Sequence, residues 1–265
     1  MTTKEKLALM LEEGNGEYIS GRAIAEELGI TRAAIWKNIH LLENDGYIIE
    51  AVTNKGYRLA VDNDAVSLSC VSRCLGKDAD NFELEVLSSV NSTNTYLKEK
   101  AADLADGHVA IAGNQTSGRG RTGRSFFSPP HTGVYLSILL KRDIPAQHAG
   151  KLTTAAAIAA CRAIEKTTDA KPEIKWVNDV FARGRKVCGI LTEASVNFET
   201  GVPDWIVTGI GFNVYEPEDG FPEEIAQIAG AIAPARKKDL RCRIAAEFII
   251  NFNELCSDLG SSAIY

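Results

Sequence analysis

Apolar and polar positions recur at helical spacing in the first 45 residues. The pattern predicts three short helices, over Lys4–Glu13, over Gly21–Leu28 and from the cap Thr31 to the break at Asp45-Gly46. Two extended runs then follow, Tyr47–Val52 and Tyr57–Ala60. A turn-forming segment, Thr53–Gly56, joins them. The predicted order is therefore three helices followed by a β-hairpin.

Beyond residue 64 the pattern mixes strands with longer helices. Extended apolar runs predict strands at Glu83–Leu87, Val109–Asn114, Val134–Leu140, Ile174–Val177, Lys186–Glu193 and Trp205–Val214. Helical spacing predicts helices at Thr93–Leu104, His148–Thr167 and Leu240–Leu259. Because Val61–Asp64 has the composition of a linker, we expect two domains, residues 1–62 and 63–265, in a chain of the α+β class.

The element order at the N-terminus resembles a winged helix-turn-helix DNA-binding domain. In such domains the start of the recognition helix contacts base edges and the wing contacts phosphates. The third helix and the hairpin would supply the DNA-binding residues Thr31, Arg32, Ala33, Trp36, Lys37, Lys55 and Arg58. A small helical protein-interaction domain stays open as the alternative, because acidic residues outnumber basic ones in this region.

Composition adds that the chain is an ordinary folded protein. Of its 265 residues 45% are hydrophobic and 24% are charged, and the formal net charge is −6. The longest apolar stretches have about seven residues, whereas a membrane span needs roughly 20. Acidic residues near the N-terminus exclude a secretory signal. We therefore expect a cytoplasmic protein without membrane association, whose six scattered cysteines are reduced and serve in packing.

The segment Gln115–Phe126 combines glycines with arginines. Its glycines form a G-x-G-x-x-G pattern at Gly118, Gly120 and Gly123. A dinucleotide-binding turn would open a helix, but a predicted strand follows here, so we exclude that interpretation. The arginines are Arg119, Arg121 and Arg124. Three like charges in six residues favour an anionic partner, a polyphosphate or an acyl phosphate, although a solvated basic loop or a nucleic-acid contact stays open.

Further polar clusters lie where predicted elements begin or end. Lys175 and Asp179 flank the end of one strand and Lys186 begins the next. Such lysines neutralise charge on phosphorus, and a carboxylate can hold Mg²⁺, although Lys175 and Asp179 taken separately stay open as ordinary surface residues. Ser92-Thr93-Asn94 opens a helix, either as a plain N-cap or as a binding cluster for a polar heterocycle. In Gly209–Val214 two glycines allow a ligand to approach the backbone closely.

Taken together, five segments resemble the biotin protein ligases. They are SVNSTN, GNQTSGRGRTGRSFFSP, KWVNDV, RKVCGILTE and GIGFNV, and the resemblance covers almost all of residues 1–255. It implies a mixed-sheet catalytic domain of the biotin/lipoate-ligase type. The implied reaction joins biotin and Mg-ATP to give biotinoyl-5′-AMP and pyrophosphate. A lysine of a biotin carrier protein, such as an acetyl-CoA carboxylase subunit, then attacks the mixed anhydride.

The resemblance also assigns roles residue by residue. The implied catalytic residues are Lys186, Arg121 and Lys175. The implied biotin-binding residues are Ser92, Thr93, Asn94, Gln115, Gly118, Arg119, Arg121, Lys186 and Gly189. The implied nucleotide-binding residues are Arg121, Arg124, Phe126, Lys175, Asn178, Asp179 and Asn213. Asp179 would also hold Mg²⁺, and the glycine-rich loop would order over biotin.

The winged helix in front is similar to the bifunctional members, which are both ligase and biotin-responsive repressor. By this resemblance, bound adenylate would order a homodimer that presents two winged helices to a two-fold operator DNA. Two alternatives stay open. One is a biotin- or adenylate-sensing transcription regulator with impaired catalysis, and the other is a lipoate-type ligase that shares the catalytic fold.

The sequence departs from the family at a few places. Val177 replaces the usual proline of the KWPND run, Thr122 replaces a common arginine, and Phe126 stands where tryptophan is usual. The family's small C-terminal SH3-like β-barrel is expected to be absent, because the sequence ends shortly after the last predicted helix. A fragment and a natural member without that domain both stay open.

Overall fold

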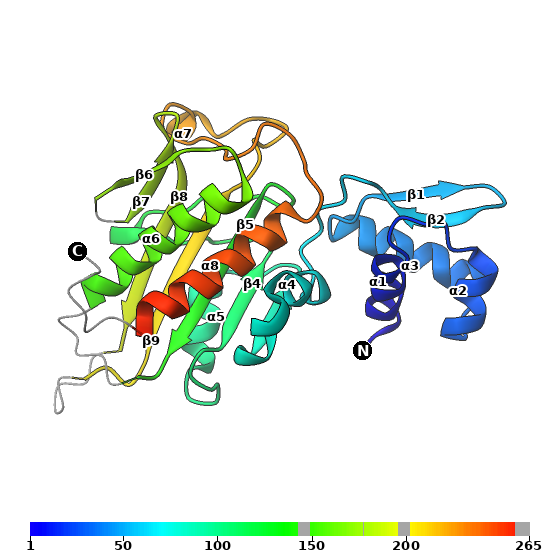
Figure 1. Ribbon diagram of the computed structural model, residues 1–265, viewed down its shortest axis with the longest axis horizontal. Helices are drawn as coiled ribbons and strands as arrows, with labels where there is room; N and C mark the ends of the chain where they lie inside the picture. Colours follow the sequence, from blue (N-terminus) through cyan, green and yellow to red (C-terminus); the bar gives the residue numbers. More distant parts are fainter. Residues whose placement is uncertain (143–148, 177, 196–201, 258–265) are drawn as a thin grey trace. The chain divides into compact units, whose positions relative to one another are not determined.

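The computed structural model describes residues 1–142, 149–176, 178–195 and 202–257 (Figure 1). The chain divides into two units, Met1–Ala65 with Arg236–Leu240, and Val66–Ala235 with Arg241–Tyr265. Both helices and a mixed sheet are present, which confirms the α+β class. Among the described residues, no helix has the length and apolar character that crossing a membrane requires.

The first unit has the predicted order of three helices and a hairpin. Its elements are α1 (Thr3–Glu13), α2 (Gly21–Leu28), α3 (Arg32–Asn44), β1 (Ile49–Val52) and β2 (Gly56–Leu59). Each helix is capped at its start by a hydroxyl residue, Thr2, Ser20 or Thr31. The cap oxygen accepts a hydrogen bond from a backbone N–H three residues later in the chain. The apolar faces meet in one core, which includes Leu7, Leu11, Ile24, Ile35, Ile39 and Leu42.

The second unit is built on a seven-stranded sheet with the strand order β3-β4-β5-β9-β8-β7-β6. The strands are β3 (Leu84–Leu87), β4 (Val109–Ala112), β5 (Gly133–Leu140), β6 (Pro172–Lys175), β7 (Asp179–Ala182), β8 (Arg185–Ala194) and β9 (Ile206–Asn213). β3 and β4 are parallel, and the other neighbouring pairs are antiparallel. The central strands β5 and β9 are buried along their whole length.

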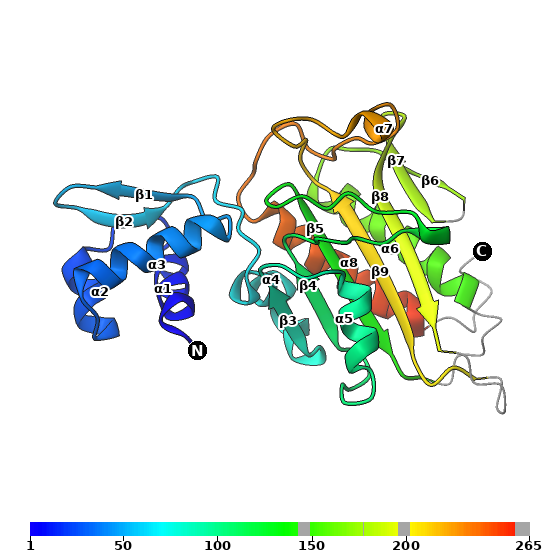
Figure 2. The ribbon, with the colours of Figure 1, turned by 180° about the vertical axis from the view of Figure 1, so that it is seen from behind.

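Helices cover the two faces of this sheet. α6 (Ala149–Thr167) and α8 (Leu240–Ser257) lie on the face seen in Figure 1, and α5 (Thr93–Lys100) lies on the face seen in Figure 2. Alanines of α6, among them Ala156 and Ala160, are fully buried, since their small side chains permit close packing. The ring of Phe212 on β9 contacts Phe248 of α8 edge-on. The face under α5 carries the polar cluster described below.

Several predicted boundaries differ from the structure. The helix from Thr93 ends at Lys100, the strand from Val109 ends at Ala112, and the strand at Ile174 begins at Pro172. Five elements were not predicted: α4 (Leu68–Leu75), the 3₁₀ helices Gly76–Asn81 and Arg121–Gly123, β7 and α7 (Glu223–Ala226). β7 and α7 have four residues each, too few to show a period. Position 148, position 177 and positions 258–259 of the predicted elements lie outside the described residues.

The cysteines are mostly buried. Cys70, Cys188, Cys242 and Cys256 are buried, and Cys74 and Cys161 are half-buried. Burial raises the pKa of the Cys188 thiol well above its ordinary value, and burial raises that of Cys161 to about 11. Neutral, buried thiols of this kind support the predicted packing role.

Candidate functional site

Three glycines on β8 and β9 form the floor of the candidate site. Gly189 is paired with Gly211, and Gly209 is the next glycine on the same face of β9. A Cβ at Gly209 would lie 1.8 Å from Asn94 Oδ1, and a Cβ at Gly211 would lie 2.4 Å from the ring of Phe126. No side chain fits at these positions without a shift of its neighbours. A group that lies above the floor can therefore approach the sheet backbone closely.

The Ser92-Thr93-Asn94 cluster is buried above this floor at the start of α5. The Ser92 side chain makes no capping hydrogen bond, so the plain N-cap interpretation is not supported. Gln115 Oε1 accepts a hydrogen bond of 2.9 Å from the Thr93 backbone N–H. Gln115 Nε2 donates to Ser128 Oγ at 3.0 Å. The amide plane of Gln115 is therefore held at the edge of the cluster.

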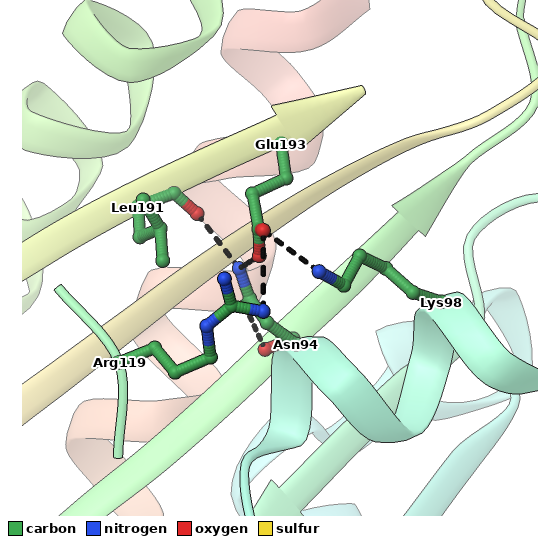
Figure 3. Close-up of polar contacts among 6 residues, drawn as sticks. Asn94, Lys98, Arg119, Leu191 and Glu193 are labelled. Atoms are coloured by element: carbon green, nitrogen blue, oxygen red, sulfur yellow. Dashed lines mark hydrogen bonds and ion pairs between the residues drawn. The ribbon is translucent and has the colours of Figure 1, made fainter. Parts of the chain in front are cut away.

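The Asn94 amide is held from three sides. Its Nδ2 donates to Leu191 O at 3.1 Å and to Glu193 Oε2 at 2.9 Å. Its Oδ1 lies 2.6 Å from Ser137 Oγ. Because an amide oxygen only accepts hydrogen bonds, Ser137 is the donor in that contact. Figure 3 shows the contacts of this amide with Leu191 and Glu193 of strand β8.

The cluster and the glycine floor enclose a narrow pocket of about 20 Å³. Its lining consists of Ser92, Thr93, Asn94, Gln115, Arg119, Phe126, Gly189, Leu191, Gly209, Ile210 and Gly211. The Phe126 ring lies against the floor, since a Cβ at Gly189 would be 2.8 Å from it. This volume holds about one water molecule. Movement of the Phe126 ring would lengthen the pocket along the glycines.

The glycine–arginine loop folds back on itself beside this pocket. Arg119 pairs with Ser125 in an antiparallel bridge, and the Phe126 N–H donates to Gly118 O at 2.8 Å. A Cβ at Gly118 would lie 2.3 Å from Phe126 O, so this position requires glycine. At the tip, Thr122 has a φ of 55°, in the left-handed region that favours glycine. The loop is thus a short hairpin rather than the start of a helix.

A wider cavity of about 350 Å³ adjoins the narrow pocket. It is lined by Arg119, Gly120, Arg121, Thr122, Arg124, Ser125, Phe126, Asn178, Asp179, Lys186, Gly189 and Ile190. Lys186 Nζ lies 2.6 Å from Asp179 Oδ1, and Arg121 Nη1 donates to Asn178 Oδ1 at 3.3 Å. Three arginines and one lysine thus face a single carboxylate in this lining. The cavity therefore favours an anionic ligand.

Three of the expected site residues line neither the pocket nor the cavity: Gly118 in the loop, Lys175 and Asn213. Lys175 ends β6, and its ammonium lies 4.8 Å from the centre of the Phe181 ring. Asn213 is buried at the end of β9, where its Nδ2 donates to Lys186 O at 3.5 Å. Asn213 therefore contacts the backbone of the lysine that lines the cavity. The substituted position Val177 lies outside the described residues.

Two charged residues at the site carried no predicted role, Lys98 and Glu193. Glu193 Oε1 lies 2.7 Å from Lys98 Nζ and 3.5 Å from Arg119 Nη1. Burial opposes ionisation of Glu193, but hydrogen bonds from Lys98 and Asn94 and the charges of Lys98 and Arg119 hold its pKa below the ordinary value. The signals in the sequence are a carboxylate at the end of an apolar strand and a lysine one helical turn after Asn94.

The first unit presents a second candidate surface on α3. Arg32, Ala33 and Lys37 are exposed, and Trp36 is 62% exposed. The Trp36 ring contacts the His40 ring edge-on at 4.1 Å between centroids. Trp36 follows Arg32 by four residues and precedes Lys37, so the ring and the two basic side chains share one part of the helix surface. This surface can therefore offer both charge and a flat ring to a partner.

The hairpin contributes one exposed and one internally held basic residue. Lys55 is exposed at the turn. Arg58 Nη2 lies 2.8 Å from Glu50 Oε2, and its guanidinium lies 4.5 Å from the centre of the Tyr18 ring. The Glu50 hydrogen bond raises the pKa of Arg58. Arg58 thus holds the hairpin to the segment before α2, in addition to the predicted contact with DNA.

Comparison with known proteins identifies both units. Residues 86–213 match the biotin/lipoate A/B protein ligase family, and residues 3–58 match an HTH domain. The chain is 36% identical over 235 residues to the bifunctional ligase/repressor BirA of Bacillus spizizenii, covering 88% of this chain and 72% of that protein. It is 35% identical to the bifunctional ligase/repressor BirA of Escherichia coli, over 80% of this chain and 64% of that one.

Among solved structures, the chain is similar to a biotin protein ligase from Aquifex aeolicus in complex with biotin and ATP. The TM-score is 0.56 and the sequence identity is 29%. The similarity covers 66% of this chain and 71% of that one.

Proposed function

The chain belongs to the biotin/lipoate A/B protein ligase family and carries an HTH domain, and we propose that it is a biotin protein ligase that also represses transcription. It activates biotin with ATP to biotinoyl-5′-AMP and transfers biotin to a lysine of a carrier protein. The observation that carries this proposal is the junction of a narrow polar pocket with a cationic cavity over one glycine floor.

In the first step, the pocket and the cavity would bind the two ends of one intermediate. The ureido ring of biotin is a flat donor–acceptor group, which matches the amide and hydroxyls of Gln115, Ser92 and Thr93. A carboxylate oxygen of biotin attacks the α-phosphorus of ATP, and pyrophosphate leaves. Lys186 and Arg121 would neutralise the charge on the carboxylate and the α-phosphate while holding them in line.

Mg²⁺ forms part of the proposal as the ion that accompanies ATP. Within the described residues, no three His, Cys, Asp or Glu side chains meet as a metal site. Mg²⁺ is commonly held by one or two carboxylates together with substrate phosphates. Asp179 and Asn178 line the cavity with oxygen ligands of this type and would hold the ion there. When bound, Mg²⁺ would offset phosphate charge, while Asp179 also orients Lys186.

In the second step, the carrier lysine attacks the acyl carbon of the mixed anhydride, and AMP leaves. Retention of the adenylate until that attack requires contacts that cover it, and Arg119, Arg121 and Arg124 of the loop line the cavity for this purpose. Repression would follow when carrier protein is scarce. A homodimer of adenylate-bound chains would then present two α3 helices to a two-fold operator.

Transfer of labelled biotin to a purified biotin carrier domain tests this function. We expect ATP-dependent label on the carrier, linked as an amide to one lysine. A carrier with that lysine changed to arginine is the matched control and should stay unlabelled. Absence of label on a carrier that a known biotin ligase does label would overturn the proposal.

A further inference from the structure

We propose that Glu193 is a positioning residue of the site: it fixes the Asn94 amide and tethers the glycine–arginine loop through Arg119. Asn94 lines the narrow pocket, and Arg119 lines both the pocket and the wide cavity. The identity of the ligand rests on the proposed function, but the tether itself does not.

The geometry places Glu193 at the centre of three polar side chains, those of Asn94, Lys98 and Arg119 (Figure 3). Its Oε2 accepts from Asn94 Nδ2 at 2.9 Å, and its Oε1 accepts from Lys98 Nζ at 2.7 Å. Arg119 Nη1 is 3.5 Å from the same Oε1. The Glu193 side chain is 20% exposed, so these contacts are only partly screened by water. Glu193 thus connects strand β8, helix α5 and the loop.

The first consequence concerns Asn94 and the residues behind it. Asn94 donates both of its N–H groups, to Leu191 O and to Glu193, and its Oδ1 accepts from Ser137. Ser137 Oγ is also 2.7 Å from Thr93 Oγ1, which belongs to the pocket. Loss of the Glu193 carboxylate leaves one buried N–H group of Asn94 without its charged acceptor. The hydrogen-bonded chain from Glu193 to Thr93 would then lose its fixed orientation.

The second consequence concerns the loop. Arg119 lines both the pocket and the cavity, and its backbone forms the hairpin bridge with Ser125. The Arg119 side chain is 47% exposed. Its ion pair with Glu193 holds the guanidinium toward strand β8. A tether of this kind lowers the entropy that the loop loses when a ligand binds. It therefore favours ligand binding without touching the reacting atoms.

A variant of Lys98 distinguishes a positioning role of Glu193 from a simple ion pair with Lys98. If Glu193 served only to pair with Lys98, removal of either residue would have the same effect. If Glu193 positions Asn94 and Arg119, removal of Lys98 leaves both contacts in place. The variants Glu193→Gln and Lys98→Met therefore differ in their expected results, and Glu99→Gln, an exposed glutamate on the same helix, is the matched control.

The experiment uses the whole chain and two independent measurements. The first is the rate of trypsin cleavage after Arg119, Arg121 and Arg124 in the absence of ligand. The second is the dissociation constant of biotin by calorimetry. For Glu193→Gln we expect cleavage at least fivefold faster, and about tenfold weaker biotin binding with kcat at saturating biotin within twofold of wild type. Lys98→Met and Glu99→Gln should stay within twofold of wild type in both measurements.

Two results would overturn the proposal: unchanged loop cleavage in Glu193→Gln, or equal effects of Glu193→Gln and Lys98→Met. If Glu193→Gln does not fold, Glu193→Asp gives the same test, because it keeps the charge and withdraws the carboxylate from Arg119. If the wild-type chain does not bind biotin, the proposed function fails. Loop cleavage still decides the role of Glu193 in that case.

Discussion

Lys186 Nζ lies 2.6 Å from Asp179 Oδ1, and the two side chains come from the paired strands β8 and β7. Each side chain is about three-quarters buried, so the pair fixes the lysine at the wall of the cavity. The arginines of the loop face the same space. An anion that enters the cavity therefore meets a lysine that is already oriented.

The first prediction concerns that lysine. Lys186→Met keeps the length of the side chain and removes its charge, so pyrophosphate formation from ATP and biotin should slow by roughly 10²–10³-fold. Lys186→Arg is the control and should retain more activity, because it keeps the charge. Steady-state pyrophosphate release measures both. A rate for Lys186→Met within tenfold of wild type would show that Lys186 does not stabilise the transition state.

The second prediction concerns the glycine floor. In Gly209→Ala the new Cβ would lie 1.8 Å from Asn94 Oδ1, so the amide must shift or the strand must move. We expect a loss of about 1–3 kcal/mol in the free energy of unfolding, together with loss of biotin binding. Gly113→Ala has open space around its Cβ and is the matched control. Chemical denaturation measures the first effect and calorimetry the second. Equal stability and equal biotin affinity in the two variants would show that Gly209 is not needed as part of the floor.

The third prediction concerns Phe126, whose ring lies on the floor and shortens the narrow pocket. Because the ring must move before biotin can lie along the glycines, Phe126→Ala should increase the association rate constant of biotin several-fold. Phe127→Ala is the control, because Phe127 contacts Phe221 and does not line the pocket. Stopped-flow measurements give the rate constant. An association rate that is unchanged or slower in Phe126→Ala would mean that the ring does not limit entry.

The fourth prediction concerns DNA. Trp36 is exposed on α3, so Trp36→Ala should change the free energy of unfolding by less than about 0.5 kcal/mol and still weaken DNA binding at least tenfold. DNA selected from a random library by the wild-type protein with biotin and ATP is the probe. Ile39→Ala removes part of a core side chain. It should lower the free energy of unfolding by more than Trp36→Ala does and weaken DNA binding by less. Full DNA affinity in Trp36→Ala would exclude this face of α3 from the contact.

The fifth prediction concerns pH. Burial opposes ionisation of Glu193, but its cationic and amide partners keep its pKa below the ordinary 4.5. A depressed pKa means that the ionised form stabilises the folded loop above about pH 4.5, and that this contribution is lost as the pH falls through the lowered value. Hydrogen exchange of residues 118–126 should therefore be protected equally at pH 7 and pH 5. Protection that already falls between those values would contradict the assignment.

How far the sequence predicts this molecule depends on the kind of signal. Gly21–Leu28 is predicted to the residue, because Ser20 caps it and Gly29 ends it in the left-handed conformation. α4 was missed although Ser67 caps it, because its apolar face is made partly of cysteine. β7 is held in place by pairing on both sides rather than by its own four residues. Such tertiary support leaves no local pattern.

The candidate site divides in the same way. Motif spacing identified the arginines of the loop, Lys186 and Asp179, and the structure brings them to one cavity. Lys175 and Asn213 carry the expected chemistry but do not line the cavity: Lys175 is exposed at the end of β6, and Asn213 contacts the Lys186 backbone. Glu193 and Ser137 could not be assigned a role, because their partners are about 99 and 44 residues away in sequence. Roles that depend on contacts between such distant residues can be assigned only once the fold is known.

Adenylate formation at this site can be tested by isotope exchange between labelled pyrophosphate and ATP in the presence of biotin. The exchange reports reversible adenylate formation and needs no carrier protein or DNA. We expect exchange that saturates with biotin, is not supported by lipoate, and is lost in Lys186→Met. No exchange with biotin, or exchange that lipoate supports better than biotin, would contradict the proposed function.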